Sequence, residues 1–236
     1  MQQNEPPMPA PEVSVIIPAR NEAGSIGRVI DEVHRALQGM EYEMLVVDTE
    51  STDGTVEIAR SKGARVVPEP RRGYGRAYKT GFSEAMGKYV ATLDADLTYP
   101  AGDIPGFIRL LESGADFISG ERLSSLDQKA MTGMHRIGNA MLNIAFRFLS
   151  GYRIRDSQSG MWVFRRSILG RLCLLDDGMP FSEELKMEVI MAGLKFVEAP
   201  IEYRLRVGEK KLRSFSDAWR NLKYLFRKRF GWVRTG

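Results

Sequence analysis

The sequence predicts an α/β fold in which a mostly parallel sheet has helices on both faces. Short apolar, β-rich runs alternate with amphipathic helical segments from residue 13 to residue 120, as in successive strand–helix–strand units. Several of these runs end directly in polar, carboxylate-rich stretches. At 236 residues, with 43% hydrophobic and 27% charged residues, the chain has an ordinary globular composition and can bury a sizeable core.

The predicted strands are short runs bounded by proline, glycine or carboxylates, and cover residues 13–19, 43–48, 64–69, 89–93, 115–120, 160–166 and 195–206. The predicted helices carry apolar residues three and four positions apart, such as Ile26, Ile30 and Val33. They cover residues 25–37, 55–63, 74–87, 104–114, 134–151, 182–194 and 214–232. The alternation is less regular after about residue 125, so we interpret 13–212 as one domain whose second half completes a site.

The composition excludes several classes of site. A single cysteine, Cys173, rules out an internal disulfide and suggests a reducing compartment. Two isolated histidines make a histidine-rich zinc site unexpected. The net charge is only +4, and we expect no nucleic-acid partner. Residues 1–12 are polar and proline-rich, which predicts a flexible leader, and no run of about 18 apolar residues predicts a transmembrane helix.

Three polar stretches follow predicted strands: PARNE (18–22), DTESTDG (48–54) and DADL (94–97). In open parallel sheets, ligands bind outside the carboxyl ends of the strands. We therefore expect these stretches, distant in sequence, to converge on one cleft.

Asp94 and Asp96 come directly after an apolar strand. If the strand persists, they point to the same side, since residues i and i+2 share a face. Two like charges this close repel each other unless a positive charge lies between them. The pair suits a hard divalent cation such as Mg²⁺, which is held by one or two carboxylates plus substrate phosphates. The alternative is a pair of aspartates that cap a turn.

Other candidates in these stretches also have two interpretations. Asp48 could hydrogen-bond a ribose or a base edge, or could cap a helix, a role that Asp53 could take instead. Glu22 could contact the ligand or stabilise a helix N-terminus. RRGYGRAYKTG (71–81) fails the P-loop and GxGxxG patterns at Tyr78, and its Lys79 is either a phosphate ligand or a solvated helix residue.

The ordered set PARNE, VVDTESTDGT, GYGRAYKTGF and LDADLTYP resembles the family 2 glycosyltransferases with the Rossmann-like GT-A fold. DSQSGMWVFRR, FSEELK and RLRVGEKKL are similar to the dolichol-phosphate mannose synthases and their polyprenyl-phosphate hexosyltransferase relatives. The resemblance extends from about Val13 to Leu212. Thr98-Tyr99 departs from the usual Gln-His of that branch, as do Thr49, Leu205 and Lys210 from its usual residues.

The resemblance implies a role for each matching residue. Pro18, Arg20, Glu22, Asp48 and Lys79 would line the nucleotide-sugar pocket, with Asp94, Ala95 and Asp96 at the metal and the diphosphate. Arg122, Arg136 and Lys211 would bind the phosphate of the acceptor, and Arg206, beside the departure at Leu205, is a further candidate for this role. The catalytic set would be Asp96, Arg122, Arg136 and Asp156.

The expected reaction is the inverting, metal-dependent transfer of mannose or glucose from GDP-mannose or UDP-glucose to a polyprenyl or dolichyl phosphate, with Mg²⁺ or Mn²⁺. A lipid phosphate is already anionic and needs positioning by arginines, whereas a hydroxyl acceptor needs a general base. Asp156, Glu183 and Glu184 are candidates for that base, and each has a structural alternative as a turn or helix-start residue. The other functions left open are transfer to a soluble or saccharide acceptor and a non-catalytic role in nucleotide-sugar binding or membrane scaffolding.

Residues 213–236 form a basic C-terminal segment with seven positive residues and one negative residue. Over 214–232, Leu222, Leu225 and Phe226 fall on one apolar helical face together with Phe215, Ala218 and Trp219, and the opposite face is basic. Basic amphipathic helices with aromatic residues often lie in a membrane interface. The alternatives are packing on the same domain or pairing in a homo-oligomer. We expect a peripheral protein on the cytoplasmic side of a membrane.

Overall fold

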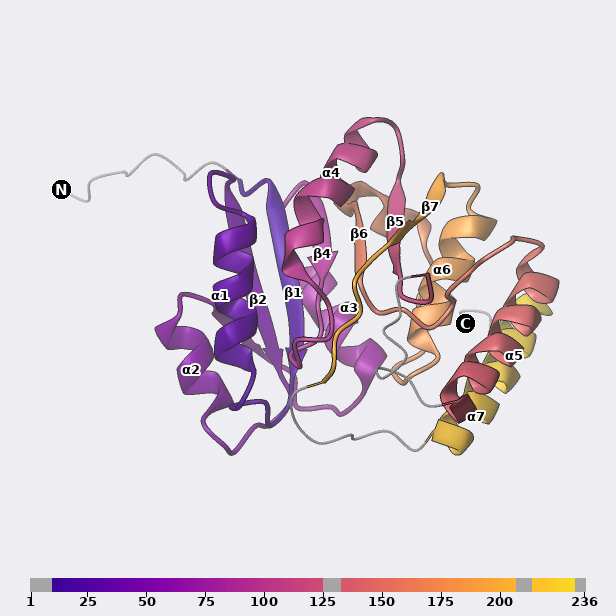
Figure 1. Cartoon of the computed structure of the whole chain (residues 1–236), viewed down its shortest axis with the longest axis horizontal. Coiled ribbons are helices and arrows are strands. Elements are labelled where there is room, and N and C mark those ends of the chain that lie inside the picture. Colours follow the sequence, from indigo (N-terminus) through magenta and orange to yellow (C-terminus); the bar gives the residue numbers. More distant parts are fainter. Residues whose placement is uncertain (1–9, 125–132, 207–213, 232–236) are drawn as a thin grey trace.

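A seven-stranded sheet runs through the molecule in the order β3-β2-β1-β4-β6-β5-β7 (Figure 1). The computed structural model describes residues 10–124, 133–206 and 214–231, and the side chains of 133–139 and 214–220 lie outside that description. Among the described strands, only β6 is antiparallel to its neighbours, so the predicted mostly parallel sheet is confirmed. The strands are β1 (Val13–Ala19), β2 (Tyr42–Asp48), β3 (Arg65–Pro68), β4 (Tyr89–Thr92), β5 (Phe117–Glu121), β6 (Trp162–Arg165) and β7 (Phe196–Pro200).

Helices cover both faces of the sheet, as expected. One face carries α1, α2 and α4 over a core that includes Ile30 and Phe107, and the other carries α3, α5, α6 and α7 over a core that includes Tyr78 and Phe181. The helices are α1 (Ile26–Ala36), α2 (Thr55–Ser61), α3 (Tyr74–Glu84), α4 (Ile104–Glu112), α5 (Gly133–Ser150), α6 (Phe181–Met191) and α7 (Ser214–Arg229), with short 3₁₀ turns η1 (Ala101–Asp103) and η2 (Arg166–Arg171).

The inner strands are mostly apolar because helices cover them on both faces. Val13, Val15, Ile16 and Ile17 of β1 are all fully buried. Burial of each such side chain stabilises the fold by roughly 1.5–3 kcal/mol. The central strands therefore form a rigid base for the polar loops that follow them.

Two of the differences between predicted and observed strand ends change the site, those of β4 and β7. β4 ends at Thr92, so Asp94 and Asp96 lie in the turn beyond the strand rather than on its alternating face. β7 ends at Pro200 instead of continuing to residue 206. Residues 201–206 instead cross the edge of the sheet, where the amide of Ile201 donates to Glu121 and that of Arg204 donates to Thr98. This crossing brings the C-terminal part of the domain to the loop after β4.

Candidate functional site

The three polar stretches predicted to converge do so at one edge of the sheet. β1 lies between β2 and β4, parallel to both, with Ala19 opposite Asp48 in the register. The loops after β1 and β2 are hydrogen-bonded to each other, since the amide of Asn21 donates to Ser51 Oγ at 2.9 Å and that of Glu22 to Thr55 Oγ1 at 2.8 Å. Strand direction alone was therefore enough to predict that these loops meet.

Backbone strain is concentrated in the same three loops. The described non-glycine residues with positive φ are Asn21 (52°), Glu50 (52°) and Leu97 (68°), one after each of β1, β2 and β4. Left-handed backbone is unfavourable for residues with a Cβ atom, and such positions cluster at functional sites. These outliers mark the cleft as a candidate site independently of its charges.

Asp48 at the end of β2 has an oxygen that lacks a partner among the described residues. Its Oδ2 accepts the amide of Ser51 at 3.1 Å, whereas the buried Oδ1 has no hydrogen bond. The side chain that contacts the start of α2 is that of Asp53, whose carboxylate accepts from Thr55 and Ala23, while Gly54 is the N-cap residue. An unsatisfied buried acceptor costs about 1–3 kcal/mol, so Oδ1 fits a donor on a ligand, such as a ribose hydroxyl or a base N–H.

Pro18, Arg20 and Glu22 lie around the end of β1, next to Asp48. Pro18 is opposite Val47 in the β1–β2 register, and Arg20 is exposed. The carbonyl of Glu22 accepts the amides of Ser25 and Ile26 at the start of α1. All three residues are therefore at the predicted pocket, and contact with a nucleotide remains a prediction.

The two aspartates after β4 are held in different ways. Asp96 is buried: its Oδ1 accepts the amide and the hydroxyl of Thr98 at 3.0 and 2.6 Å, and its Oδ2 lies 2.7 Å from Nε of Arg206. Asp94 accepts a hydrogen bond from the Tyr78 hydroxyl at 3.3 Å. The turn contacts expected of a capping aspartate are therefore present at Asp96, through Thr98, and not at Asp94.

The electrostatics of this pair fit a cation. Burial, together with the negative charge of Asp96, raises the pKa of Asp94 to about 7, while the guanidiniums of Arg206 and Arg122 oppose the shift. The described residues contain no group of three or more His, Cys, Asp or Glu side chains that could hold a metal ion. Two carboxylates fit Mg²⁺ or Mn²⁺ if the diphosphate oxygens of a nucleotide complete the coordination.

Arg122 follows β5 and forms a buried pair with Asp156. Nε and Nη2 of Arg122 donate to the two carboxylate oxygens at 2.7 and 2.9 Å, and the Arg122 amide donates to Oδ2 at 3.1 Å. Burial raises the pKa of Asp156, but the attraction of Arg122 outweighs it and the pKa is lowered. The Tyr203 ring lies 5.2 Å from the guanidinium. Asp156 therefore orients Arg122, an arrangement that favours a positioning role over proton abstraction.

The loop that carries Asp156 is held by a buried lysine that sequence reasoning missed. Nζ of Lys186, on α6, donates to the carbonyls of Asp156, Ser157 and Ser159 at 2.8–3.0 Å. Burial lowers the pKa of Lys186 to about 8, despite the attraction of Asp156. The signal in the sequence was a lysine within the FSEELK motif, at a helix position that the structure buries completely.

Four tyrosines around the site were also missed. The hydroxyl of Tyr99 accepts the amide of Gly160 at 2.7 Å, and the Tyr99 ring contacts Tyr203. Tyr78, which breaks the phosphate-loop pattern, reaches Asp94 and packs on Trp162. A Cβ at Gly160 would lie 2.4 Å from the Tyr74 hydroxyl, so a larger residue there would displace the Tyr74 side chain. The tyrosine at position 99, where the resemblance led us to expect histidine, thus anchors the Asp156 loop.

Glu183 and Glu184 are fully buried and already bonded. Glu184 accepts hydrogen bonds from the Leu175 and Asp176 amides and from Tyr224 and Lys228 of α7. Glu183 accepts from Asn221 of α7 and from Gln158. Burial raises the pKa of Glu183 to about 7. The structure supports the structural interpretation of both residues, which tie α7 to the domain.

Lys79 is 20% exposed and paired within the chain, and phosphate binding by it remains a prediction. Its Nζ lies 2.5 Å from Asp177 and donates to the carbonyl of Leu175 at 3.1 Å. A Cβ at Gly75 would lie 2.6 Å from the Asp176 carbonyl oxygen and 2.7 Å from the Phe181 Cβ, so the glycine-rich segment is needed for packing here. Arg136 is placed in α5 with its side chain outside the described residues, as is Lys211 entirely.

Comparison with known proteins identifies the family. Residues 14–173 match the model of glycosyl transferase family 2. The dolichyl-phosphate hexose transferase of Haloferax volcanii is 34% identical over 87% of this chain and 88% of its own length. The low-salt glycan biosynthesis hexosyltransferase Agl6 of the same organism is 37% identical over 92% of this chain, which spans 53% of that relative. The dolichol-phosphate mannosyltransferase of Pyrococcus furiosus is 29% identical over 92% of this chain and 63% of its own length.

The fold also matches solved structures. Glucosyl-3-phosphoglycerate synthase from Mycobacterium tuberculosis, crystallised with Mn²⁺, UDP and phosphoglyceric acid, superposes with a TM-score of 0.75 at 21% identity, over 96% of this chain and 81% of that one. At this identity the likeness shows the GT-A-like fold alone. The chain belongs to the family 2 glycosyltransferases and is a glycosyltransferase, as the sequence motifs predicted.

Proposed function

We propose that this family 2 glycosyltransferase transfers a hexose, mannose or glucose, from GDP-mannose or UDP-glucose to a polyprenyl or dolichyl phosphate, with inversion and with Mg²⁺ or Mn²⁺. The observation that carries the proposal is the state of the three candidate bases. Asp156, Glu183 and Glu184 are fully buried, and each is hydrogen-bonded to other groups of the chain. An anionic acceptor needs no base, because its phosphate oxygen is already a nucleophile.

The residues divide between the two substrates. Asp48, with Pro18, Arg20 and Glu22, would bind the nucleoside, and Asp94 and Asp96 would hold the cation. When bound, the cation would neutralise charge on the departing diphosphate. Arg122, fixed by Asp156, would orient the acceptor phosphate, because guanidinium groups recognise phosphate oxygens with directed hydrogen bonds. Arg136 and Lys211 keep the same proposed role.

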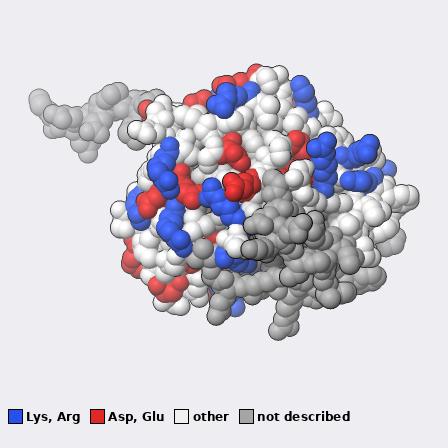
Figure 2. All heavy atoms as spheres, in the orientation of Figure 1, with Lys and Arg blue, Asp and Glu red and all other residues white. Residues whose placement is uncertain are grey.

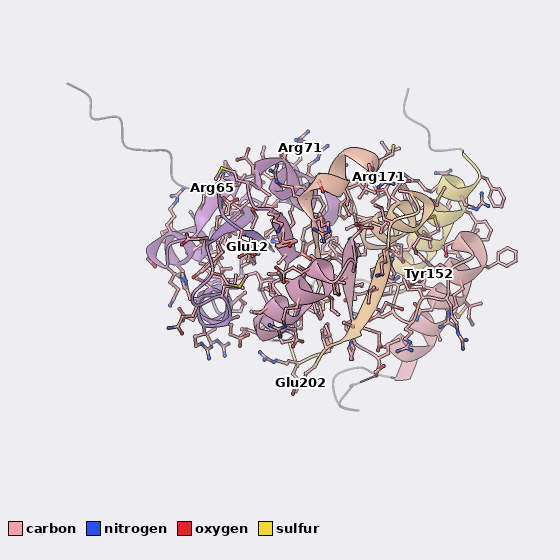
Figure 3. All side chains as sticks on the ribbon, turned by 90° about the horizontal axis from the view of Figure 1, so that it is seen from above. Glu12, Arg65, Arg71, Tyr152, Arg171 and Glu202 are labelled. Carbon is pink, nitrogen blue, oxygen red and sulfur yellow. The ribbon has the colours of Figure 1, made fainter. Side chains whose placement is uncertain are left out.

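An apolar surface on α5 and α7 supports a lipid partner. Met141, Ile144 and Phe148 recur along α5 at helical spacing and are 65–81% exposed. Phe226 of α7 and Phe230, directly after that helix, are exposed and stacked with ring centroids 6.2 Å apart. Figure 1 shows the two helices side by side, and aromatic rings project outward from them at the right-hand end of Figure 3. We name these five residues the α5–α7 surface.

Charge around the α5–α7 surface favours an anionic membrane. Lys223 and Arg227 are exposed, and neither 140–150 nor 221–231 contains an acidic residue. Figure 2 shows acidic and basic side chains mixed over α1 and α2, but mainly uncharged atoms at the right-hand edge over the last turns of α5. Part of the predicted apolar face of α7 packs on the domain instead, since Leu225 is fully buried. One of the basic residues of α7, Lys228, pairs with Glu184 of α6. None of the described helices has the length and hydropathy needed to cross a membrane.

Transfer is tested directly by mass spectrometry. Purified protein is incubated with Mg²⁺ or Mn²⁺, a polyprenyl phosphate and a panel of nucleotide sugars. We expect a glycosylated lipid phosphate from one sugar donor, absent in Asp96→Ala and present in Asp31→Ala, whose aspartate is on the outer face of α1. If sugar were transferred to a soluble hydroxyl acceptor but not to the lipid phosphate, the proposed lipid-phosphate acceptor would be wrong.

Membrane binding is tested by flotation with vesicles. Wild type should float with vesicles that contain anionic lipid and much less with neutral ones, because both apolar burial and basic residues contribute. Phe148→Glu should weaken flotation, whereas Met86→Glu, at an exposed methionine before β4, should not. Unchanged flotation in Phe148→Glu would refute membrane binding by the α5–α7 surface. If wild type were a dimer and Phe148→Glu dissociated it, the surface would instead bind a second copy of the chain.

A further inference from the structure

Asp96, the proposed cation ligand, is already paired with a cation of the chain itself. Nε of Arg206 lies 2.7 Å from Oδ2, and the Asp96 side chain is only 4% exposed. The other oxygen, Oδ1, accepts both hydrogen bonds from Thr98. Oδ1 is therefore fully occupied, and a divalent cation at Oδ2 would lie beside the positive charge of Arg206, which opposes its binding until Arg206 moves away.

Arg206 is the partner that can leave. Thr98 is two residues from Asp96, and one of its bonds comes from the backbone of the same tight turn. The Arg206 side chain is 31% exposed and reaches Asp96 from a distant part of the chain. The backbone beside it is fixed, because the Arg204 amide donates to the Thr98 carbonyl at 3.0 Å. Rotation about side-chain bonds alone would release the Arg206 guanidinium.

The segment that carries Arg206 also contacts the acceptor arginine. The Ile201 amide donates to the Glu121 carbonyl, next to Arg122, and the Tyr203 ring lies against the Arg122 guanidinium. Glu202, labelled in Figure 3, belongs to this crossing segment. Because the segment is anchored at both places, a released Arg206 remains close to Arg122, where its charge can serve an anionic group.

We propose that Arg206 competes with the divalent cation for Asp96, so that binding of the cation with the nucleotide diphosphate frees Arg206 for an anionic acceptor. The inference rests on the metal site and the anionic acceptor of the proposed function. It assigns an order to the reaction: the sugar donor and the cation bind first, and the phosphate acceptor binds second. While Arg206 neutralises Asp96, the acceptor site lacks one of its positive charges.

The competition is tested by Mn²⁺ titration, with free Mn²⁺ followed by electron paramagnetic resonance, in the presence and absence of UDP or GDP. Arg206→Met should bind Mn²⁺ about tenfold more tightly than wild type, because the variant has no ion pair to break. The pair joins a buried and a partly exposed group, so its strength lies between those of surface and buried ion pairs. Arg206→Lys keeps the charge and should stay near wild type. Arg204→Met, the matched control, removes a pair with Glu32 and should leave the affinity unchanged.

A second measurement follows the proposed order. Binding of a short-chain polyprenyl phosphate to wild type should tighten when Mn²⁺ and UDP or GDP are added, and this gain should be lost in Arg206→Met. An unchanged or weaker Mn²⁺ affinity in Arg206→Met would overturn the competition and leave the metal site in place. If neither protein bound Mn²⁺ even with UDP and GDP, the metal site itself would be wrong, and the competition with it.

Discussion

Replacement of Asp156 by asparagine tests how Arg122 is held. Asp156 is fully buried and Arg122 nearly so, and the carboxylate accepts three hydrogen bonds from Arg122. Asn has the same shape but one acceptor oxygen and no charge, so the guanidinium stays buried without its counter-ion. Breaking a buried ion pair in this way costs about 3–5 kcal/mol.

That cost is a large part of the total stability of a domain, which is about 5–15 kcal/mol. For a chain of this size, about 1 kcal/mol lowers the melting temperature by roughly 2–4 °C, so Asp156→Asn should melt about 10 °C lower. Urea denaturation at pH 7 gives the free energy directly. Asp116→Asn is the control, because the half-exposed Asp116–Arg165 pair at 3.9 Å should contribute about 1 kcal/mol or less.

The pH dependence has a defined sign. Arg122 holds the pKa of Asp156 below its ordinary value in spite of burial, so the stabilisation is complete above the ordinary aspartate range and is lost as pH falls through the folded pKa. The difference in free energy of unfolding between wild type and Asp156→Asn should therefore disappear only at acid pH. In transfer assays the variant should lose kcat and affinity for the acceptor while keeping its KM for the nucleotide sugar. If Asp156→Asn lowered the free energy of unfolding at pH 7 by less than about 1 kcal/mol, the reasoning would be refuted.

Three further predictions concern other parts of the site. Folded Glu183 keeps its proton up to about pH 7, whereas the unfolded chain releases it near pH 4.5. As the pH rises from 4.5 to 8, the free energy of unfolding of Glu183→Gln, measured by urea denaturation, should therefore increase by up to about 3 kcal/mol relative to that of wild type. A difference that stays constant with pH would contradict the burial argument. Gly75→Ala should destabilise the domain by about 1–3 kcal/mol, because its Cβ overlaps the Asp176 carbonyl and Phe181, and an unchanged melting temperature would disprove this close approach. Asp48→Ala should weaken binding of UDP or GDP by about tenfold in calorimetry, because Oδ1 has no hydrogen bond within the described residues and is free for a donor on the ligand; equal affinity would remove Asp48 from the pocket.

The sequence was sufficient where local pattern and strand direction carry the information. The apolar runs placed the seven strands, and the polar residues after β1, β2 and β4 had to meet because parallel strands end at the same edge. The ordered motifs were sufficient for the family. The end of β4 was predicted one residue too late, because Leu93 looks like a strand residue but pairs only through its amide with Ile16.

Only the tertiary structure decided which charges are paired. Asp156 and Arg122 are 34 residues apart, Lys186 meets the Asp156 loop from another helix, and Arg206 crosses from the end of β7 to Asp96. No local spacing encodes these contacts, since each depends on how elements distant in sequence pack. The sequence determined that carboxylates and arginines share one edge of the sheet. The packing determined which of them neutralise one another, because a buried charge is tolerated only beside a partner that the fold brings to it.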